Sequence, residues 1–527
     1  VIDNSLEYLT TFEVPEEWKD LEYKDNQKLT FNESINLLKG DTLPVSSFIK
    51  NKEGIFEGTT TKEEKRNIAE EVPCWISENC IECNQCAFSC PHGVIRPFLL
   101  DKKDSKVESI PSLLPKDKEF TIGINYEECT GCGVCTLACP GKLGKKALEM
   151  VPNKDKENNF EYLLKNNVND KYQSNLLTVK NVSFKEPKFE YSGACAGCGE
   201  TPYITNLTRV FNDNLMIANA TGCSSIYSGS VPSMPYSIPW ASSLFEDNTE
   251  YGYGILQGIN IKRDKIKKYM KEYPRNKLFK KWIENMDNYD ICKEVKENID
   301  YKKHPYLNDM KDYILPKQLW VLGGDGFAYD IGYGGLDHVL SKKDNINILV
   351  LDTEVYSNTG GQSSKSSNIG SVASFTSNGK DNYKKDLARI AMCYPHVYVA
   401  SVNIGYNKEQ YLKAIKEASL HNGPSLIIAY SPCIEHGIKT GMQHSQSNGY
   451  LATKCGYFLT FRYNPDTKKF SLDSKEPEFD KYEDYLMTEN RFASLVRKDK
   501  ERARLLLEEQ KQWAIDRYNY YKKISEE

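Results

Sequence analysis

The segment from Gln318 to Gln362 reads QLWVLGGDGFAYDIGYGGLDHVL, then a polar break, then INILVLDTEVYSNTGGQ. The runs Leu319–Leu322 and Ile346–Leu351 are short, apolar and stopped by glycine or polar residues, which is typical of strands buried on both faces. A helix is expected between them, from Tyr329 to Leu340. We therefore predict a strand–helix–strand unit in a parallel sheet, with both polar clusters at one edge.

Oxygen-bearing side chains gather at that predicted edge. Asp325 stands between Gly324 and Gly326, and Thr353 and Asn358 follow the second strand. Such ligands suit Mg²⁺, which shares its shell with substrate phosphates. The glycines would let the backbone approach a pyrophosphate, and the following helix would add its first N–H groups. The pattern resembles the thiamine diphosphate motif; the alternative is an ordinary glycine turn with a solvated aspartate.

Bulk composition limits the classes of protein to consider. The 527 residues are too many for one core, so two or more domains are expected. A net charge of -4 argues against a nucleic-acid partner or an anionic membrane surface. No apolar run approaches the ~20 residues of a membrane helix. The chain starts at Val1 and has no signal-like segment, so we expect a cut or mature piece of a longer protein.

Eight of the sixteen cysteines form two copies of one spacing, each followed by proline. This spacing is the bacterial ferredoxin signature, in which the fourth cysteine of each run reaches the other cluster. The predicted ligands of the two 4Fe–4S clusters are therefore Cys80, Cys83, Cys86 and Cys139 for one, and Cys129, Cys132, Cys135 and Cys90 for the other. Structural zinc and disulfides are the alternatives, and neither explains matched triplets. A reducing, oxygen-poor compartment is expected: the cytoplasm, with an organelle such as a hydrogenosome as the alternative.

A third cluster is expected beside the thiamine site. Cys195-x2-Cys198 is a half-site that needs further ligands. The predicted strand Leu215–Ala220 ends just before Cys223, and the predicted strand Ser425–Tyr430 ends just before Cys433. If both strands join the parallel sheet, both cysteines reach the edge where Asp325 stands. The alternative is that these are buried small residues, and Cys455 competes with Cys433. Cys74 is interpreted as a buried or free thiol, and Cys292 and Cys393 as structural.

Four domains are predicted along the chain. Residues 1–65 form a polar connector, 66–185 the two-cluster module, 186–480 the thiamine diphosphate domain and 481–527 a helical end. Within these, Arg96–Asn125 is expected to carry a loop that lies against a neighbouring domain. Asp247–Pro316 is expected to be a surface helical region with a solvated charged face, and Tyr482–Glu527 one long amphipathic helix that packs on the core or on a second subunit.

Long strings of the sequence resemble the pyruvate:ferredoxin (flavodoxin) oxidoreductases of the 2-oxoacid oxidoreductase family. They include GACAGCGETPY, ANATGCSSIY, SLFEDN, GGDG and SPCIEHG, and the likeness runs from about Gly58 to about Tyr463. The resemblance implies oxidative decarboxylation of pyruvate with coenzyme A as co-substrate, giving acetyl-CoA and carbon dioxide. Three clusters would pass the electrons to ferredoxin or flavodoxin.

The resemblance also implies roles for single residues. Cys195, Cys198, Cys223 and Cys433 would hold the proximal cluster, which favours Cys433 over Cys455. Asp325, Thr353 and the carbonyl of Val355 would bind Mg²⁺, and Asn358 would lie near the reacting carbon as the catalytic candidate. The expected cofactor-binding residues are Gly222, Cys223, Gly324, Asp325, Gly326, Thr353, Val355 and Asn358.

The family's single chains are much longer than this one. Their additional domains hold the thiamine pyrimidine with its activating glutamate and most of the pyruvate and coenzyme A contacts. A partner is therefore expected, either the amino-terminal half or a separate subunit, in a dimeric assembly. Two alternatives stay open: another 2-oxoacid such as 2-oxobutyrate, and a non-catalytic iron–sulfur module. No G-x-G-x-x-G follows a predicted strand, which weighs against a dinucleotide site.

Overall fold

The computed structural model describes residues 13–20, 29–51, 56, 58–153, 158–172, 174, 176–229 and 233–526. Its strands are β1 Glu71–Trp75, β2 Ile95–Leu100, β3 Ile110–Pro111, β4 Glu119–Ile124, β5 Leu148–Pro152, β6 Leu215–Ala220, β7 Trp240–Ser243, β8 Gln318–Gly323, β9 Asn347–Asp352, β10 Tyr398–Val402, β11 Ser425–Tyr430, β12 Phe461–Asn464 and β13 Lys469–Leu472.

The α-helices among the described residues are α1 Phe31–Asn36, α2 Gln85–Ser89, α3 Val134–Ala138, α4 Phe160–Asn166, α5 Val179–Ser183, α6 Thr201–Phe211, α7 Cys223–Ile226, α8 Asn248–Lys271, α9 Lys277–Glu284, α10 Tyr289–Asn298, α11 Pro305–Asp309, α12 Asp325–Ala328, α13 Tyr333–Leu340, α14 Leu387–Ala391, α15 Lys408–Leu420, α16 Ser445–Lys454, α17 Tyr482–Leu486, α18 Asn490–Lys498 and α19 Lys500–Glu526.

The chain separates into two units, Val1–Phe56 and Glu57–Glu527. Much of the predicted connector, at 1–12, 21–28, 52–55 and 57, lies outside the described residues. The described part of the first unit contains α1, which begins at a Thr30–Glu33 capping box. Residues 58–65 belong to the second unit, where the Thr59 N–H donates to the Tyr236 carbonyl at 3.0 Å. The other predicted domain boundaries stay predictions.

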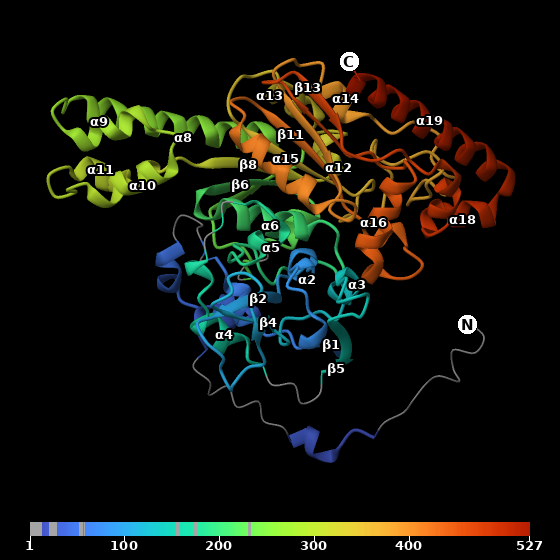
Figure 1. Ribbon diagram of the computed structural model, residues 1–527, viewed down its shortest axis with the longest axis horizontal. Helices are drawn as coiled ribbons and strands as arrows, with labels where there is room; N and C mark the ends of the chain where they lie inside the picture. Colours follow the sequence, from blue (N-terminus) through green and yellow to red (C-terminus); the bar gives the residue numbers. More distant parts are fainter. Residues whose placement is uncertain are drawn as a thin grey trace. The chain divides into compact units, whose positions relative to one another are not determined.

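An eight-stranded sheet forms the centre of the second unit, in the order β13-β12-β10-β11-β9-β8-β6-β7 (Figure 1). The strands from β10 to β7 are parallel, and β12 and β13 run antiparallel at one end. The predicted parallel α/β sheet is therefore confirmed. The predicted strands Leu215–Ala220 and Ser425–Tyr430 match β6 and β11. All six residues of β9 and of β11 are buried, which explains their unbroken apolar sequences.

The sheet is covered on both faces. Alternate residues of β8 show this: Leu319 and Val321 join a cluster with α13 and α19, while Trp320 and Leu322 join a cluster with α6 and α15. The carboxyl ends of β6, β8, β9 and β11 therefore remain as the open edge where connecting loops meet.

The predicted helix Tyr329–Leu340 corresponds to α13, which begins four residues later at Tyr333, and a separate short helix, α12, precedes it. Gly332 lies between the two helices; its N–H donates to the Gly326 carbonyl at 3.1 Å, and a Cβ at this position would meet the Phe245 and Phe327 backbones. Because α12 begins directly at Asp325, the carboxylate occupies the first turn of a short helix.

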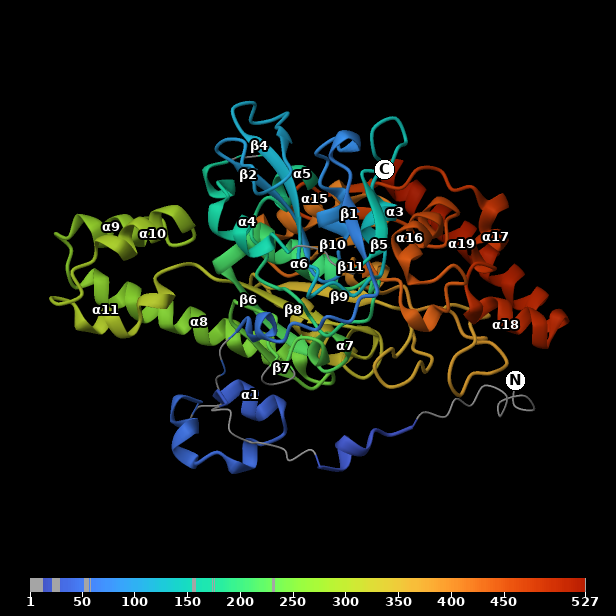
Figure 2. The ribbon, with the colours of Figure 1, turned by 90° about the horizontal axis from the view of Figure 1, so that it is seen from below.

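The two cysteine runs lie in a ferredoxin-like fold. β1 pairs antiparallel with β5, and each cysteine run leads into a short helix, α2 or α3 (Figure 2). The segment Arg96–Asn125, predicted to carry a loop, also contains β3, β4 and most of β2, which form an antiparallel sheet. The prolines at positions 97 and 111 obscured these strands; all six residues of β2 are nevertheless buried.

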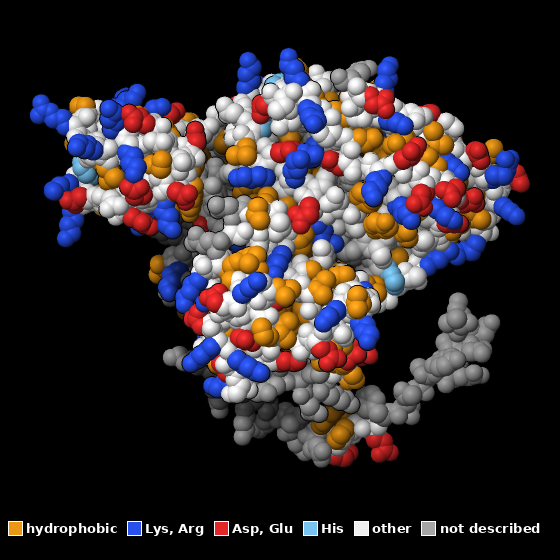
Figure 3. All heavy atoms as spheres, in the orientation of Figure 1, with side chains coloured by type: hydrophobic (Ala, Val, Ile, Leu, Met, Phe, Trp, Pro, Cys, Tyr) orange, Lys and Arg blue, Asp and Glu red, His pale blue; other side chains and the backbone are white. Residues whose placement is uncertain are grey.

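The predicted surface helical region 247–316 forms an arm of α8 to α11. Figures 1 and 2 both show it extending from the sheet on the side opposite α18 and α19. It has its own apolar core, which includes Ile266, Met270 and Trp282. Figure 3 shows basic and acidic side chains intermingled over its visible face. None of the described helices is both long and apolar enough to cross a membrane.

The predicted single helix Tyr482–Glu527 is corrected to three helices, α17, α18 and α19. Asp499 ends the second and begins the third, since its Oδ1 accepts from the Arg502 N–H at 3.0 Å. The long α19 packs on the core, where Ala514, Tyr518 and Tyr521 are buried.

Candidate functional site

A cavity of about 490 Å³ opens at the carboxyl ends of β6, β8 and β9. The three strands are adjacent and parallel, so the loops that follow them converge there. The cavity is lined by every cofactor-binding residue predicted from the sequence: Gly222, Cys223, Gly324, Asp325, Gly326, Thr353, Val355 and Asn358. Parallel-strand topology thus brings together loops that lie more than a hundred residues apart in sequence.

Asp325 offers an unused carboxylate oxygen in this cavity. Its Oδ2 accepts from Ser364 Oγ at 2.6 Å, while the buried Oδ1 has no hydrogen-bond partner. Burial and the nearby Asp352 raise the pKa of Asp325 well above its usual value. A buried, unpartnered carboxylate oxygen is costly unless a cation satisfies it.

Thr353 and Val355 supply two further oxygens. Thr353 Oγ1 donates to the Val355 carbonyl at 2.9 Å, and Ser357 Oγ donates to Thr353 Oγ1 at 3.0 Å. A carboxylate, a hydroxyl and a carbonyl, all oxygen donors, fit Mg²⁺ bound next to a pyrophosphate. The predicted ligands therefore fit the ion chemically.

Asn358 lies on the exposed rim of the same cavity. It follows Ser357 in the loop after β9 and is exposed, whereas Thr353 and Val355 in the same loop are buried. Its catalytic role stays a prediction.

In each of the first two predicted cysteine sets, three cysteines come from one run and the fourth comes from the other run. Burial raises the pKa of Cys86, and the next contributions come from Cys83, Cys80 and Cys139. Burial also raises the pKa of Cys135, followed by Cys132 and Cys90. Cys139 thus lies among the thiols of the first run, and Cys90 among those of the second.

Both cysteine loops use left-handed backbone at the same two positions. Gly131 and Gly133 have φ of 67° and 74°, and the equivalent Glu82 and Asn84 have 52° and 58°. Only glycine adopts this region without cost. In the first loop, contacts with α5 compensate: Glu82 pairs with Lys180 Nζ at 3.0 Å, and Asn84 Nδ2 donates to the Lys180 carbonyl at 3.0 Å.

Four further cysteines form the third set. Burial raises the pKa of Cys223, and Glu200, Cys433, Cys198 and Cys195 raise it further. Burial also raises the pKa of Cys455, but the charged group that raises it further is Glu489 rather than a cysteine of the third set. Cys455 therefore lies in a different environment from Cys223. The geometry favours Cys433, although ligation itself stays a prediction.

The described residues contain no group of three or more His, Cys, Asp or Glu side chains arranged to hold one metal ion. A four-iron cluster separates its thiolates further than a single ion does, so that finding concerns single-ion sites. Each set contains the four cysteines that such a cluster requires, and ligation stays a prediction.

Sequence reasoning missed Glu200, which lines the cavity between the third cysteine set and the thiamine site. Its side chain is buried and accepts from Tyr227 Oη at 2.9 Å. Burial raises the pKa of Glu200 to about 7. An acidic residue directly after C-A-G-C-G was the available signal.

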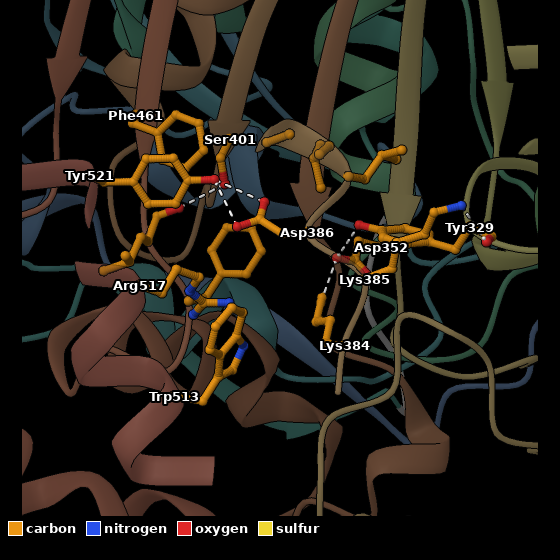
Figure 4. Close-up of a pocket in the computed structure, with 15 residues that line it drawn as sticks. Tyr329, Asp352, Lys384, Lys385, Asp386, Ser401, Phe461, Trp513, Arg517 and Tyr521 are labelled. Atoms are coloured by element: carbon orange, nitrogen blue, oxygen red, sulfur yellow. Dashed lines mark hydrogen bonds and ion pairs between the residues drawn. The ribbon is translucent and has the colours of Figure 1, made fainter. Parts of the chain in front are cut away.

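Sequence reasoning also missed a buried network of charged side chains around the loop that follows β9. Lys384 Nζ lies 2.8 Å from Asp352 and 2.7 Å from Glu354, and Arg491 lies 2.9 Å from Glu354. His436 Nε2 is 2.7 Å from the Thr353 carbonyl. Figure 4 shows Lys384 facing Asp352 in a second, smaller cavity of about 40 Å³ beside α19. Lys384 is one of several lysines in a polar loop and stands next to Lys385, so the sequence gave no signal for its role.

Three family patterns match the chain. Residues 79–143 match a 4Fe-4S dicluster domain, and residues 312–429 match the C-terminal thiamine pyrophosphate-binding domain of thiamine enzymes. Residues 31–69 match the EKR domain, whose function is unknown. The fold and the two matched sites define a chain that joins a ferredoxin-like dicluster domain to a thiamine diphosphate-binding domain.

Curated relatives cover nearly all of the chain. It is 42% identical to the pyruvate:ferredoxin oxidoreductase of Moorella thermoacetica, over 100% of this chain and 49% of that protein. It is 40% identical to the pyruvate-flavodoxin oxidoreductase of Enterobacter agglomerans, over 99% and 48%. The corresponding protein of Klebsiella pneumoniae is 41% identical over 94% and 45%. The chain is thus a homologue of the pyruvate:ferredoxin and pyruvate-flavodoxin oxidoreductases, which confirms the resemblance.

The chain spans about half the length of these relatives. A solved 2-oxoglutarate:ferredoxin oxidoreductase from Magnetococcus marinus aligns with a TM-score of 0.32 and 18% identity, over 51% of this chain and 68% of that one. At that distance the likeness carries no argument about the site.

Proposed function

We propose that this chain is the iron–sulfur and pyrophosphate-binding part of an enzyme that converts pyruvate and coenzyme A to acetyl-CoA and carbon dioxide. Ferredoxin or flavodoxin would receive the electrons. The observation that carries the proposal is Cys223, which lines the Asp325 cavity and belongs to the third cysteine set. This position of Cys223 supports a predicted electron acceptor next to the thiamine site.

The residues of this chain would bind and orient, while bound thiamine diphosphate would supply the carbanion chemistry that splits off carbon dioxide. Asp325, Thr353 and the Val355 carbonyl would hold Mg²⁺. The N–H groups at the start of α12, together with Gly324 and Gly326, would receive the pyrophosphate. Asn358 on the rim would contact the substrate end of the cofactor.

The three cysteine sets suggest the order of electron transfer. Gly197, between Cys195 and Cys198, contributes a backbone hydrogen bond that lowers the pKa of Cys132 against the effect of burial. Cys86 in turn contributes to the raised pKa of Cys135. These links support an order from the third set to the Cys129–Cys132–Cys135–Cys90 set, and then to the Cys80–Cys83–Cys86–Cys139 set.

The last set in this order lies near the surface. Ile81 and Leu143 are exposed beside it, as are Lys142 and Lys145. An exposed apolar and basic surface at the end of the cluster series would suit a soluble, acidic electron carrier. We propose the cytoplasm, or another reducing and oxygen-poor compartment, as the place where this occurs.

The test is an anaerobic assay of this chain together with the remaining half found in its relatives, whether on the same polypeptide or another. Pyruvate, coenzyme A and a viologen acceptor should give acetyl-CoA, carbon dioxide and reduced viologen in fixed proportion. Preference for 2-oxobutyrate would change the substrate assignment. Complete inactivity with every 2-oxoacid, despite bound thiamine diphosphate, would favour a non-catalytic electron-transfer module.

A further inference from the structure

Ser357 connects the two halves of the site. It follows β9 and is half-buried between the predicted Mg²⁺ ligand Thr353 and the predicted cluster ligand Cys433. Its Oγ lies 3.0 Å from Thr353 Oγ1 and 3.3 Å from Cys433 Sγ. These two partners come from the ends of neighbouring strands, β9 and β11. One hydroxyl therefore touches both metal-binding loops.

The donors and acceptors in this chain of hydrogen bonds must change when a cluster is present. In the structure the Cys433 thiol donates to Ser357, and Ser357 donates to Thr353. A cysteine that holds iron is a thiolate and has no proton to donate. A serine hydroxyl rotates and can both donate and accept. Ser357 would then donate to Cys433 Sγ and accept from Thr353 Oγ1. The Thr353 proton would turn from the Val355 carbonyl to Ser357, which leaves that carbonyl and the Thr353 lone pairs available for the cation.

We propose that Ser357 is a positioning residue that sets the reduction potential of the cluster held by Cys433 and couples this potential to Mg²⁺ binding at Thr353. The inference rests on the proposed function, because it requires the third cluster. Hydrogen bonds to the sulfurs are one determinant of cluster potential. Reduction adds negative charge, so an O–H donor at the thiolate stabilises the reduced state more than the oxidised state.

The cation strengthens the same contact. Mg²⁺ bound through Thr353 Oγ1 would polarise that hydroxyl and make it a better donor to Ser357. A polarised Ser357 would in turn donate more strongly to Cys433. Cofactor loading should therefore raise the potential of the adjacent cluster, and part of this rise should pass through Ser357.

The first experiment is an anaerobic redox titration of the full chain, with the clusters followed by electron paramagnetic resonance. Ser357→Ala should lower the potential of the third cluster, so that its reduced-to-oxidised ratio at a fixed potential falls about tenfold, which is 59 mV for a one-electron couple. Ser357→Thr keeps the hydroxyl and should restore most of the shift. Ser374→Ala removes a serine hydroxyl that donates to the Gly360 carbonyl instead, and should change nothing.

A second measurement repeats the titration on the chain combined with the complementary half found in its relatives, with and without saturating Mg²⁺ and thiamine diphosphate. The rise in potential should be larger in the wild-type protein than in Ser357→Ala, and equal rises would overturn the coupling. If Ser357→Ala retains about twelve iron atoms and its potential is unchanged, the role of Ser357 is overturned while the third cluster stands. About eight iron atoms in the wild-type protein would overturn both the third cluster and the role of Ser357. If Ser357→Ala loses its third cluster, Ser357→Gly removes the same hydroxyl, and loss of the cluster there too would overturn a purely tuning role.

Discussion

Asp325 divides its two carboxylate oxygens between the protein and the cavity, with Oδ2 on Ser364 and Oδ1 buried without a partner. Removing the carboxylate deletes the charged member of the proposed Mg²⁺ set. Asp325→Ala should weaken Mg²⁺-dependent thiamine diphosphate binding more than about 100-fold. Isothermal titration calorimetry measures this, with Asp381→Ala on an exposed surface loop as the control.

The visible absorbance of the two ferredoxin-type clusters should be the same in Asp325→Ala as in the wild-type protein. Their cysteines lie in the β1–β5 region, away from the loop that carries Asp325. Unchanged cofactor affinity in Asp325→Ala would show that the cation binds elsewhere.

Cys433 and Cys455 form a matched pair for testing the third cluster. Cys433 lies among Glu200 and the other thiols of the set, whereas Cys455 Sγ contacts the Ala452 carbonyl in the core. Anaerobically prepared wild-type protein should contain about twelve iron atoms per chain, and Cys433→Ala about eight. Cys455→Ala should keep about twelve. A loss of iron in Cys455→Ala alone would reverse the assignment.

Asp325 and the cysteine sets could be proposed from the sequence, because cation and cluster chemistry restricts both the residue types and their spacing. The ferredoxin spacing is a local pattern, and the GDG and NTGGQ loops follow strands that the sequence shows clearly. Ser357, Glu200 and Lys384 were missed for a different reason. Their roles depend on contacts between loops far apart in sequence, and serine, glutamate and lysine are common in loops that have no such role.

The short helix α18 in the carboxyl-terminal segment contacts the loop that follows β9 through an ion pair. Arg491 on α18 is buried and lies 2.7 Å from Glu489 and 2.9 Å from Glu354. Glu354 is next to Thr353 and has a φ of 59°, so its left-handed backbone depends on these side-chain contacts. Through this ion pair, a helix outside the sheet restrains the loop that would bind the cation.

Replacing Arg491 should therefore destabilise the protein strongly. Arg491→Ala leaves Glu354 and Glu489 buried without one of their cationic partners, which should cost about 3–5 kcal/mol. Arg497→Ala changes the same helix at an exposed position, where the guanidinium contacts only Asn490 among the interactions found, and should cost less than about 1 kcal/mol. Urea unfolding followed by tryptophan fluorescence compares the two, and equal costs would contradict the network.

Acid should weaken the same network. Burial alone would raise the pKa of Glu354, but Lys384, Arg491 and His436 hold it at about 2. Because this folded-state value lies below the unfolded value of 4.5, the stabilisation is complete above about pH 5 and is lost as the pH falls toward 2. Glu354→Gln cannot titrate, so its stability should fall less between pH 6 and pH 3, by up to about 2 kcal/mol. Parallel pH profiles of the two proteins would exclude Glu354 as the titrating group.

Elements were predictable where burial imposes a simple pattern. The strands of the parallel sheet are nearly continuous apolar runs, so β6, β8, β9 and β11 were located to within a residue or two. The helix predicted to begin at Tyr329 begins at Tyr333, because Gly332 separates it from α12. The single predicted carboxyl-terminal helix was wrong, because Asp499 ends α18 and begins α19. The strands β2 and β4 were hidden by the proline in β2 and by the long polar segment between them.

At the scale of the whole chain, residues around the rim of the candidate site are exposed to solvent. Asn358 and Thr221 on the cavity rim are exposed, and apolar Ile331 and Leu244 beside it are 62% and 59% exposed. Exposed apolar groups around a cavity mark a surface that another protein part covers. The relatives are about twice as long as this chain, so we propose that their remaining half supplies the cover. In the proposed enzyme that half also brings the thiamine pyrimidine site.

A preparation of these 527 residues alone should therefore bind Mg²⁺ and thiamine diphosphate weakly and oxidise pyruvate at less than about a hundredth of the reconstituted rate. The physical reason is that one domain fixes only the pyrophosphate end of the cofactor, so the reactive end is not held against substrate. Adding the complementary half should restore activity and reduce the accessibility of the rim. Hydrogen–deuterium exchange of the Thr353–Gln362 loop measures the second effect independently of turnover. Full activity of the isolated chain, with no change in exchange on adding the other half, would mean that the cavity described here already contains the complete site.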